Sequence, residues 1–140
     1  MNSYLALEKA QAKEWNTFPL GFAFSDKQFK EMMEKFGLKE TDTDKIYSIG
    51  AGGYIRKSDS NAFDEMFKRH RKEIEDEIEK DKKGTGFIYS MFRYELANHE
   101  YCITYDIERT LDALGLTLDE INKKENLLNG LRKALKEYRD

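Results

Sequence analysis

The sequence contains one cysteine, one proline and no long uninterrupted run of apolar residues among its 140 positions. The single thiol, Cys102, excludes an internal disulfide framework and agrees with a reducing compartment. No apolar stretch approaches the roughly 20 residues that cross a bilayer. The N-terminus also lacks the basic start and apolar centre of a secretory signal. We therefore expect a cytoplasmic protein with no membrane partner.

Excess positive charge is missing as well, because the formal net charge is −3 at pH 7. Phosphate contacts need a positive surface, so this balance argues against direct nucleic-acid binding by the chain as a whole. Hydrophobic residues make up 39% and charged residues 36%, which suits a folded chain with a real core. We expect a single domain spanning residues 1–140.

Most of the sequence places its apolar residues at helical spacing. Ser25 with Gln28, and Thr117 with Glu120, have the spacing of capping boxes at helix starts. Gly37 and Gly115 stand where left-handed helix ends belong. The pattern predicts helices over 3–15, 25–37, 58–84, 87–99, 106–114 and 117–138, the last interrupted near Asn126 and Gly130.

Three segments depart from helical spacing. Residues 46–57 alternate aliphatic and polar side chains around a glycine-rich centre, which predicts a β-hairpin. Residues 18–24 are apolar and aromatic, which suits a buried extended segment or edge strand. Residues 100–104 form a short connection of β-friendly residues. The expected fold is α+β, mostly helical, with a small antiparallel sheet at about 46–57.

The glycines at Gly50, Gly52 and Gly53 superficially match a phosphate-binding loop. Such loops are followed by a helix whose N-terminus binds the phosphate, whereas a strand pattern follows Gly53. Glycine that supplies positive φ in a tight turn is the favoured interpretation. The alternative that Gly50–Gly53 binds a nucleotide stays open, as does insertion of the loop into a partner's cleft.

Few residues are suited to metal binding or nucleophilic catalysis. Glu95 and His99 lie four apart on one predicted helix face, with Cys102 just beyond and His70 on another helix. A zinc site needs about four ligands, and the neighbours of Cys102 favour a buried, inert thiol. We therefore expect no metal, no cofactor and no catalytic residue. A small enzyme that uses His70, Glu95 and His99 beside the glycine loop remains the alternative.

A basic block and an acidic block follow each other along the helix predicted after the hairpin. Pairing between them would make a solvated, self-neutralised face. The functional alternative is that the basic residues contact an acidic partner, with a hairpin tyrosine as an aromatic anchor. The predicted partner-binding residues are Tyr54, Arg56, Lys57, Lys68, Arg69, Arg71 and Lys72. Ile74 and Ile78 could alternatively pair helices in a homo-oligomer.

Four blocks of sequence carry a resemblance that covers most of the chain. They are the segments 20–29, 44–57, 94–101 and 110–115, which include Leu-Gly-Phe-Ala-Phe-Ser and Tyr-Ser-Ile-Gly-Ala-Gly-Gly-Tyr-Ile-Arg-Lys. They resemble a group of small uncharacterised proteins from phages and mobile elements of gut-type bacteria. That setting is similar to the one in which anti-CRISPR inhibitors occur. The resemblance implies no catalytic residue.

These observations favour a non-enzymatic phage or mobile-element accessory protein. Its expected partner is a host protein or protein–nucleic-acid complex, with a CRISPR effector as one candidate. The competing hypotheses are a small nucleotide- or metal-binding enzyme and a helical oligomerisation module that uses residues 74–78.

Overall fold

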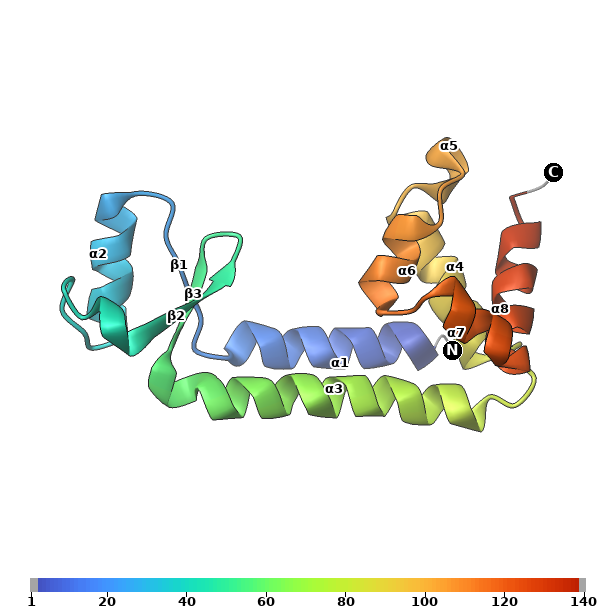
Figure 1. Cartoon of the computed structure of the whole chain (residues 1–140), viewed down its shortest axis with the longest axis horizontal. Coiled ribbons are helices and arrows are strands. Elements are labelled where there is room, and N and C mark those ends of the chain that lie inside the picture. The colour runs from blue at the N-terminus through green and yellow to red at the C-terminus, as the bar shows by residue number, and fades with distance from the viewer. Residues whose placement is uncertain (1–2, 139–140) are drawn as a thin grey trace. The chain divides into compact units, whose positions relative to one another are not determined.

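The structure is a computed structural model and describes residues 3–138. Within these residues the chain forms eight α-helices and three β-strands (Figure 1). The helices are α1 (Ser3–Thr17), α2 (Asp26–Lys35), α3 (Ser60–Lys80), α4 (Phe87–Asn98), α5 (Tyr101–Thr104), α6 (Glu108–Leu114), α7 (Leu118–Lys123) and α8 (Glu125–Lys136). The strands are β1 (Gly21–Phe22), β2 (Ile46–Gly50) and β3 (Gly53–Arg56). The mostly helical α+β prediction is confirmed.

Contacts within the chain gather into two compact units. The hairpin unit comprises Lys13–His70, and the helical unit comprises residues up to Ala12 together with those from Arg71 onward. Helices α1 and α3 each contribute residues to both units. That the whole chain behaves as one domain stays a prediction.

The hairpin unit is built on a three-stranded antiparallel sheet in the order β1-β3-β2. The predicted hairpin is confirmed: β2 and β3 pair through Ile46↔Arg56 and Gly50↔Gly53. The edge strand predicted within 18–24 is also present as β1, which pairs with β3. The other alternative, a buried segment, is wrong, because Phe22 and Phe24 are exposed. A two-residue strand leaves part of this aromatic segment without a covering layer.

Helix α2 covers one face of the sheet. The hydroxyl of Ser25 accepts from the backbone N–H of Gln28 at 3.2 Å, as the capping box predicts. The Gln28 side chain returns to the N–H of Phe24, at 2.8 Å, instead of to that of Ser25. Gly37, with φ of 76°, then ends the helix in the predicted left-handed conformation.

A small core lies between α2 and the sheet. Met32, Met33 and Phe36 are buried there with Ile46 of β2. Gly21 of β1 is buried where α2 comes closest, and a Cβ at this position would overlap Met32 and Phe36. The missing side chain therefore sets how closely helix and sheet approach.

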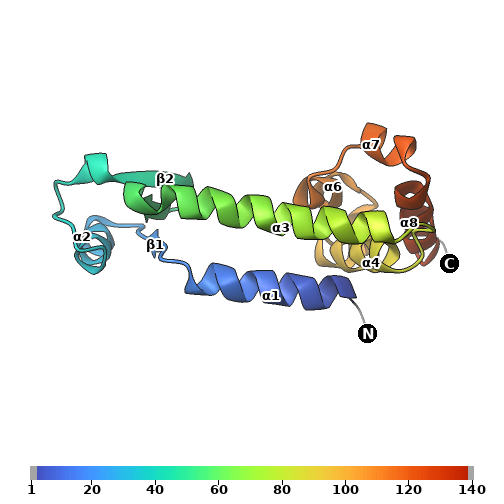
Figure 2. The same ribbon diagram turned by 90° about the horizontal axis from the view of Figure 1, so that it is seen from below.

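The helical unit is centred on α4, which is its most buried helix, as predicted. Four of its side chains are fully buried: Ile88, Met91, Phe92 and Leu96. Helix α8 packs beside α4, as both views show (Figure 1 and Figure 2). Gly130 of α8 allows this contact, because a Cβ there would overlap Ile88 and approach the carbonyl oxygen of Gly84 to 2.7 Å. The predicted interruption of the terminal helix falls between α7 and α8, and Gly130 does not break α8.

The junction between α3 and α4 is fixed by two polar side chains. The Asp81 carboxylate accepts from the backbone N–H groups of Gly84, Gly86 and Ile88 at 3.1, 3.1 and 2.9 Å. It thus satisfies the start of α4, where the N-cap residue is a glycine. The Asn126 amide donates to the carbonyls of Ile78 and Asp81 at 3.1 and 3.2 Å. Asp81 thus caps α4 from the segment just before it, and Asn126 ties the end of α3 to α8.

Two predictions for the segment after α4 are wrong. Residues 101–104 form a single helical turn, α5, instead of an extended connection, and Cys102 is exposed instead of buried. The turn is bracketed by Glu100 and Tyr105, both in the left-handed region with φ of 57° and 54°. The ring of Tyr101 packs 5.1 Å from that of Tyr138, which ties the turn to the end of the described chain.

The apolar residues in the second half of α3 are used inside the helical unit. Ile78 is buried in its core, and Ile74 packs against that core. The chain itself therefore covers much of the surface through which residues 74–78 were predicted to form a homo-oligomer. Self-association through these residues stays a prediction.

Candidate binding site on the hairpin

The face of the sheet opposite α2 carries exposed aromatic side chains. Residues paired across antiparallel strands point to the same side, and side chains alternate along each strand. Phe22 pairs with Gly53, and Tyr47 pairs with Ile55, so these four residues share one face. Phe22 is 56% exposed and Tyr47 49% exposed, whereas Ile55 between them is buried.

The turn of the hairpin supports a third aromatic ring. Gly50, Ala51 and Gly52 all have positive φ, at 88°, 53° and 76°. The φ of 76° at position 52 favours glycine, and a Cβ there would also have to displace the ring of Phe24. The backbone N–H of Ala23 donates to the carbonyl of Gly52 at 2.9 Å and holds the chain beside the turn. Phe24 nevertheless remains 74% exposed.

Cationic side chains border this aromatic surface. The amine of Lys57 lies 5.0 Å from the ring centroid of Tyr47, within the range of a cation–π contact. Lys45 immediately precedes β2, and its side chain is 57% exposed. The surface therefore combines large aromatic groups, a class enriched at protein interfaces, with exposed lysines at its border.

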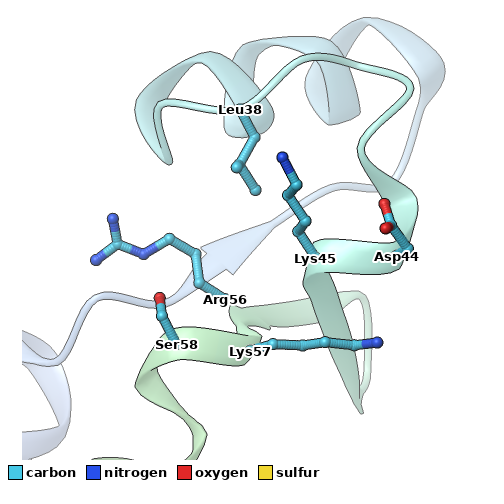
Figure 3. Close-up of a pocket in the computed structure, with 6 residues that line it drawn as sticks. All are labelled: Leu38, Asp44, Lys45, Arg56, Lys57 and Ser58. Carbon is cyan, nitrogen blue, oxygen red and sulfur yellow. The ribbon is translucent and has the colours of Figure 1, made fainter.

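A shallow pocket of about 230 Å³ lies where β2 begins and β3 ends (Figure 3). It is lined by Leu38, Asp44, Lys45, Arg56, Lys57 and Ser58. The Nε of Arg56 donates to Asp59 at 2.8 Å, and Lys45 lies 3.7 Å from Asp42. Lys57 is exposed and lies over an aromatic ring instead of against a carboxylate. The pocket can therefore accept an anionic group without first breaking a tight ion pair of Lys57.

The predicted hairpin contacts have unequal access to solvent. Tyr54 is half-buried against the α2 core, with its ring 5.8 Å from that of Phe29. Arg56 is also half-buried and stacks 5.8 Å from the ring of Phe36. Of these three residues, Lys57 alone is exposed. The structure places Tyr54 mainly in a structural role and leaves Arg56 and Lys57 at the pocket.

Two of the four predicted contacts on α3, Arg69 and Lys72, are paired with carboxylates within the chain. Both terminal nitrogens of Arg69 donate to the Glu14 carboxylate, at 2.7 and 2.5 Å. Lys72 contacts Asp76 one turn further along α3, at 3.0 Å. Lys68 and Arg71 are exposed. This agrees with the self-neutralised helix face more than with a continuous basic surface.

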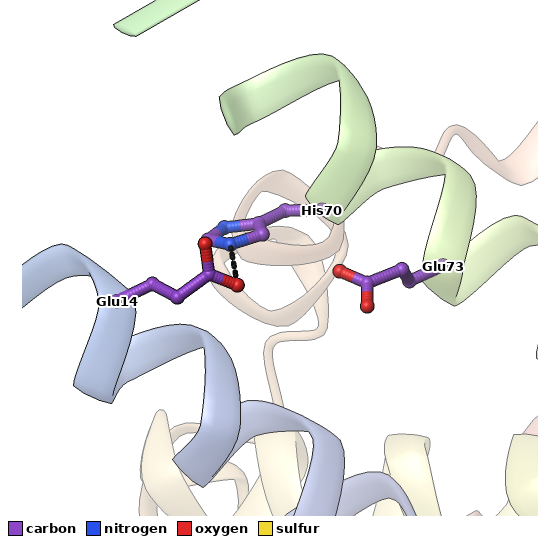
Figure 4. Close-up of side chains that lie close together, drawn as sticks. All are labelled: Glu14, His70 and Glu73. Carbon is purple, nitrogen blue, oxygen red and sulfur yellow. Dashed lines mark ion pairs between the residues drawn. The ribbon is translucent and has the colours of Figure 1, made fainter. Parts of the chain in front are cut away.

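His70 belongs to the same charged contact. Its Nε2 lies 3.3 Å from the Glu14 carboxylate, as the dashed line in Figure 4 marks. Hydrogen bonding from Arg69, aided by that from His70, lowers the pKa of Glu14 to about 2. The guanidinium of Arg69 binds this carboxylate with both nitrogens, so Glu14 is held in a bidentate ion pair.

Glu95 and His99 come together in the helical unit, as their spacing predicts. Glu95 is buried and accepts from the Tyr4 hydroxyl at 2.7 Å, and its other oxygen lies 3.2 Å from His99 Nε2. His70 instead has Glu14 as its partner in the hairpin unit. Glu95 therefore anchors a buried polar contact between α1 and α4. This contact has a complete structural explanation without catalysis.

The residues that sequence reasoning missed are Phe22, Phe24, Tyr47 and Lys45. The strand alternation already carried a signal for Tyr47, because it places this residue on the side opposite Ile46. The phenylalanines gave no such signal, since an apolar run of this kind is usually buried.

Comparison with known proteins adds one relationship. None of the helices in residues 3–138 is long and apolar enough to cross a membrane. No curated protein and no solved structure matches the chain. One protein family matches over residues 3–137, which is nearly the whole sequence. The chain belongs to this family, described as a family of unknown function (DUF7659).

Proposed function

We propose that this protein is a non-enzymatic accessory protein that binds a host protein, alone or within a nucleoprotein complex, through the hairpin unit. The observation that carries the proposal is the exposure of three large aromatic side chains, Phe22, Phe24 and Tyr47, on one small sheet. Aromatic side chains dominate the energetics of protein interfaces when a partner covers them. Keeping three of them in water on so small a sheet points to an interface.

Charge supports a protein partner over bare nucleic acid. The pocket cations Lys45 and Arg56 stand beside the carboxylates of Asp42 and Asp59, which offset part of their charge and leave only a small excess of positive charge around Lys57. The whole chain carries a net charge of −3. Nucleic-acid binding draws most of its affinity from neutralised phosphates, which this surface does not provide in number.

The biological setting is supported by the sequence resemblance alone. It favours a phage or mobile-element protein, and a CRISPR effector complex is the first partner to test. The same hairpin surface would then contact a protein component of that complex.

Site-specific photo-crosslinking tests the proposed function. A photo-reactive phenylalanine analogue replaces Phe24, and a matched chain carries it at Tyr105, an exposed aromatic position in the helical unit. Both chains are irradiated in lysates of gut bacteria that carry such elements and with purified CRISPR effector complexes. We expect a discrete protein adduct from position 24 and none from position 105.

The adduct must also depend on the rest of the surface. Tyr47→Ala should reduce it without changing the circular dichroism spectrum, because this ring is about half exposed. Equal labelling from both positions, or labelling that Tyr47→Ala leaves unchanged, contradicts the proposed interface.

A further inference from the structure

Strand β2 forms one edge of the sheet, because the strand order is β1-β3-β2. In the described part of the chain, no backbone hydrogen bond joins Tyr47, Ser48 or Ile49 to anything beyond β3. Tyr47 and Ser48 are exposed, and β2 contains no proline. Such an edge can pair with an additional extended segment.

The pocket lies at one end of this edge. Lys45 immediately precedes β2, and Arg56 and Lys57 stand where β3 ends, opposite the start of β2. A strand added antiparallel to β2 would run toward this end and finish beside Ile46. Its C-terminal residues would then meet the pocket, and a parallel strand would bring its N-terminal residues there instead.

The chemistry of the pocket selects between these directions. The amine of Lys57 has an aromatic ring beneath it, and Lys45 is held only by an exposed contact of 3.7 Å with Asp42. Exposed ion pairs of this kind contribute little to stability, so Lys45 can leave Asp42 for another carboxylate at small cost. The Ser58 hydroxyl adds a neutral donor to the lining. The lining carries three cationic side chains, Lys45, Arg56 and Lys57, against one carboxylate, Asp44, so it suits a carboxylate better than an amino terminus.

We propose that the hairpin unit binds an extended peptide segment with an acidic C-terminal end, which adds to β2 as an antiparallel strand and places a carboxylate in the pocket. This inference rests on the proposed function and names the kind of segment that the partner presents. Main-chain hydrogen bonds along β2 would supply affinity, and Lys45 and Lys57 would supply selectivity.

A second copy of this chain is a poorer occupant. Its β2 would end at Gly50 and continue into Ala51, so it would bring no carboxylate to the pocket. Lysines beside a sheet edge also discourage pairing between identical edges. The edge is therefore open to a segment of different sequence.

The test uses a defined probe. A short synthetic peptide of alternating threonine and valine ends in two aspartates and a free carboxylate, and the full chain is labelled with ¹⁵N. We expect slowed amide exchange and shifted resonances along Tyr47–Ile49, with binding measured by fluorescence polarisation. A peptide with N-methylated amides at alternate positions should lose the exchange protection, because it cannot form the strand hydrogen bonds.

Charge variants distinguish binding at the pocket from non-specific electrostatic attraction to the chain. Lys57→Glu should weaken binding of the acidic peptide by about tenfold, the loss of one charge-assisted hydrogen bond. Lys82→Glu makes the same charge change at an exposed residue in the helical unit and should leave binding unchanged. A peptide that ends in two lysines and an amide should not bind.

Several outcomes would overturn the inference. These are no change at Tyr47–Ile49 at millimolar peptide, equal binding of the N-methylated peptide, or equal weakening by Lys57→Glu and Lys82→Glu. If the peptide does not bind while position 24 still crosslinks a partner, the strand-addition inference fails and the proposed function stands. If the peptide binds but position 24 crosslinks nothing, the proposed function fails instead.

Discussion

The hydroxyl of Tyr4 donates to the carboxylate of Glu95 at 2.7 Å and thereby joins residues 91 positions apart in the sequence. Both side chains are buried. Burial first, and then the hydrogen bond to Glu95, raise the pKa of Tyr4 well above its ordinary value. This bond fastens the start of the chain to the most buried helix of the helical unit.

Removing the Tyr4 hydroxyl should destabilise the protein. Tyr4→Phe keeps the ring in the core but leaves a buried acceptor of Glu95 without its donor, which costs about 1–3 kcal/mol. Urea denaturation followed by circular dichroism measures the change in the free energy of unfolding. The matched variant Tyr105→Phe removes an exposed hydroxyl and should change it by less than about 0.5 kcal/mol. Equal stability of the two variants would contradict the assigned role.

Glu8 should make stability depend on pH in the opposite sense from a paired carboxylate. Burial, and then the charge of Glu95, raise its pKa, and one of its oxygens is buried without a hydrogen-bond partner among the described residues. Ionisation of Glu8 therefore costs stability. The cost is absent below the ordinary pKa and fully present above the raised one.

Glu8→Gln is consequently expected to raise the melting temperature at neutral pH and to change it little at about pH 3.5, below the ordinary pKa. Thermal denaturation of both chains at the two pH values measures the difference. Glu79→Gln, at an exposed position on α3, serves as the control and should show no such pH-dependent gain. A gain of equal size at both pH values would show that charge is not the cause.

Glu14 should behave in the usual way for a paired carboxylate. Its pKa is lowered to about 2, chiefly by the hydrogen bonds from Arg69. The contribution to stability is present above the ordinary pKa and is lost as pH falls from there toward 2. An NMR titration of the side-chain carbonyl carbon gives the pKa directly.

Arg69→Gln should return the pKa of Glu14 most of the way to the ordinary range, because it removes the largest cause of the shift. Lys68→Gln removes the adjacent positive charge, which makes no contact of this kind, and should leave the pKa near 2. If both variants raise the pKa equally, the general charge of α3 is responsible and the bidentate pair is not.

Gly130→Ala should destabilise the helical unit although alanine is the better helix former. Helix propensity alone predicts a gain of about 1 kcal/mol. The new Cβ would overlap Ile88 and approach the Gly84 carbonyl, so we expect a net loss of about 2 kcal/mol or more. Asn129→Ala, at the exposed neighbouring position on α8, should be neutral or slightly stabilising in the same denaturation assay. Stabilisation by Gly130→Ala would show that the two helices can move apart without cost.

Local signals account for the part of the fold that the sequence predicts. Ser25, Thr117, Gly37 and Gly115 mark helix ends through bonds or φ values that involve only near neighbours. The hairpin is predicted for the same reason, because its alternation and its glycines lie within one short segment. These features depend only on residues close in sequence and do not require contacts with distant parts of the chain.

Features that depend on distant contacts could not be predicted. The segment with Cys102 has β-friendly residues, yet it forms a helical turn whose Tyr101 ring packs on Tyr138. The exposure of Phe22 and Phe24 depends on how little of the sheet is covered. The sequence therefore pointed to the hairpin on which we propose a site, with Arg56 and Lys57 lining its pocket, but it did not predict the exposed aromatic surface.

The division of the chain has a consequence for synthesis on the ribosome. All of Lys13–His70 is contiguous, so the hairpin unit can form as soon as this stretch has emerged. The contact between Tyr4 and Glu95 can form only after Glu95 has been synthesised, and α4 is covered only once α8 has been made. The surface proposed to recognise a partner is thus complete while the first residues made are still without their final neighbours.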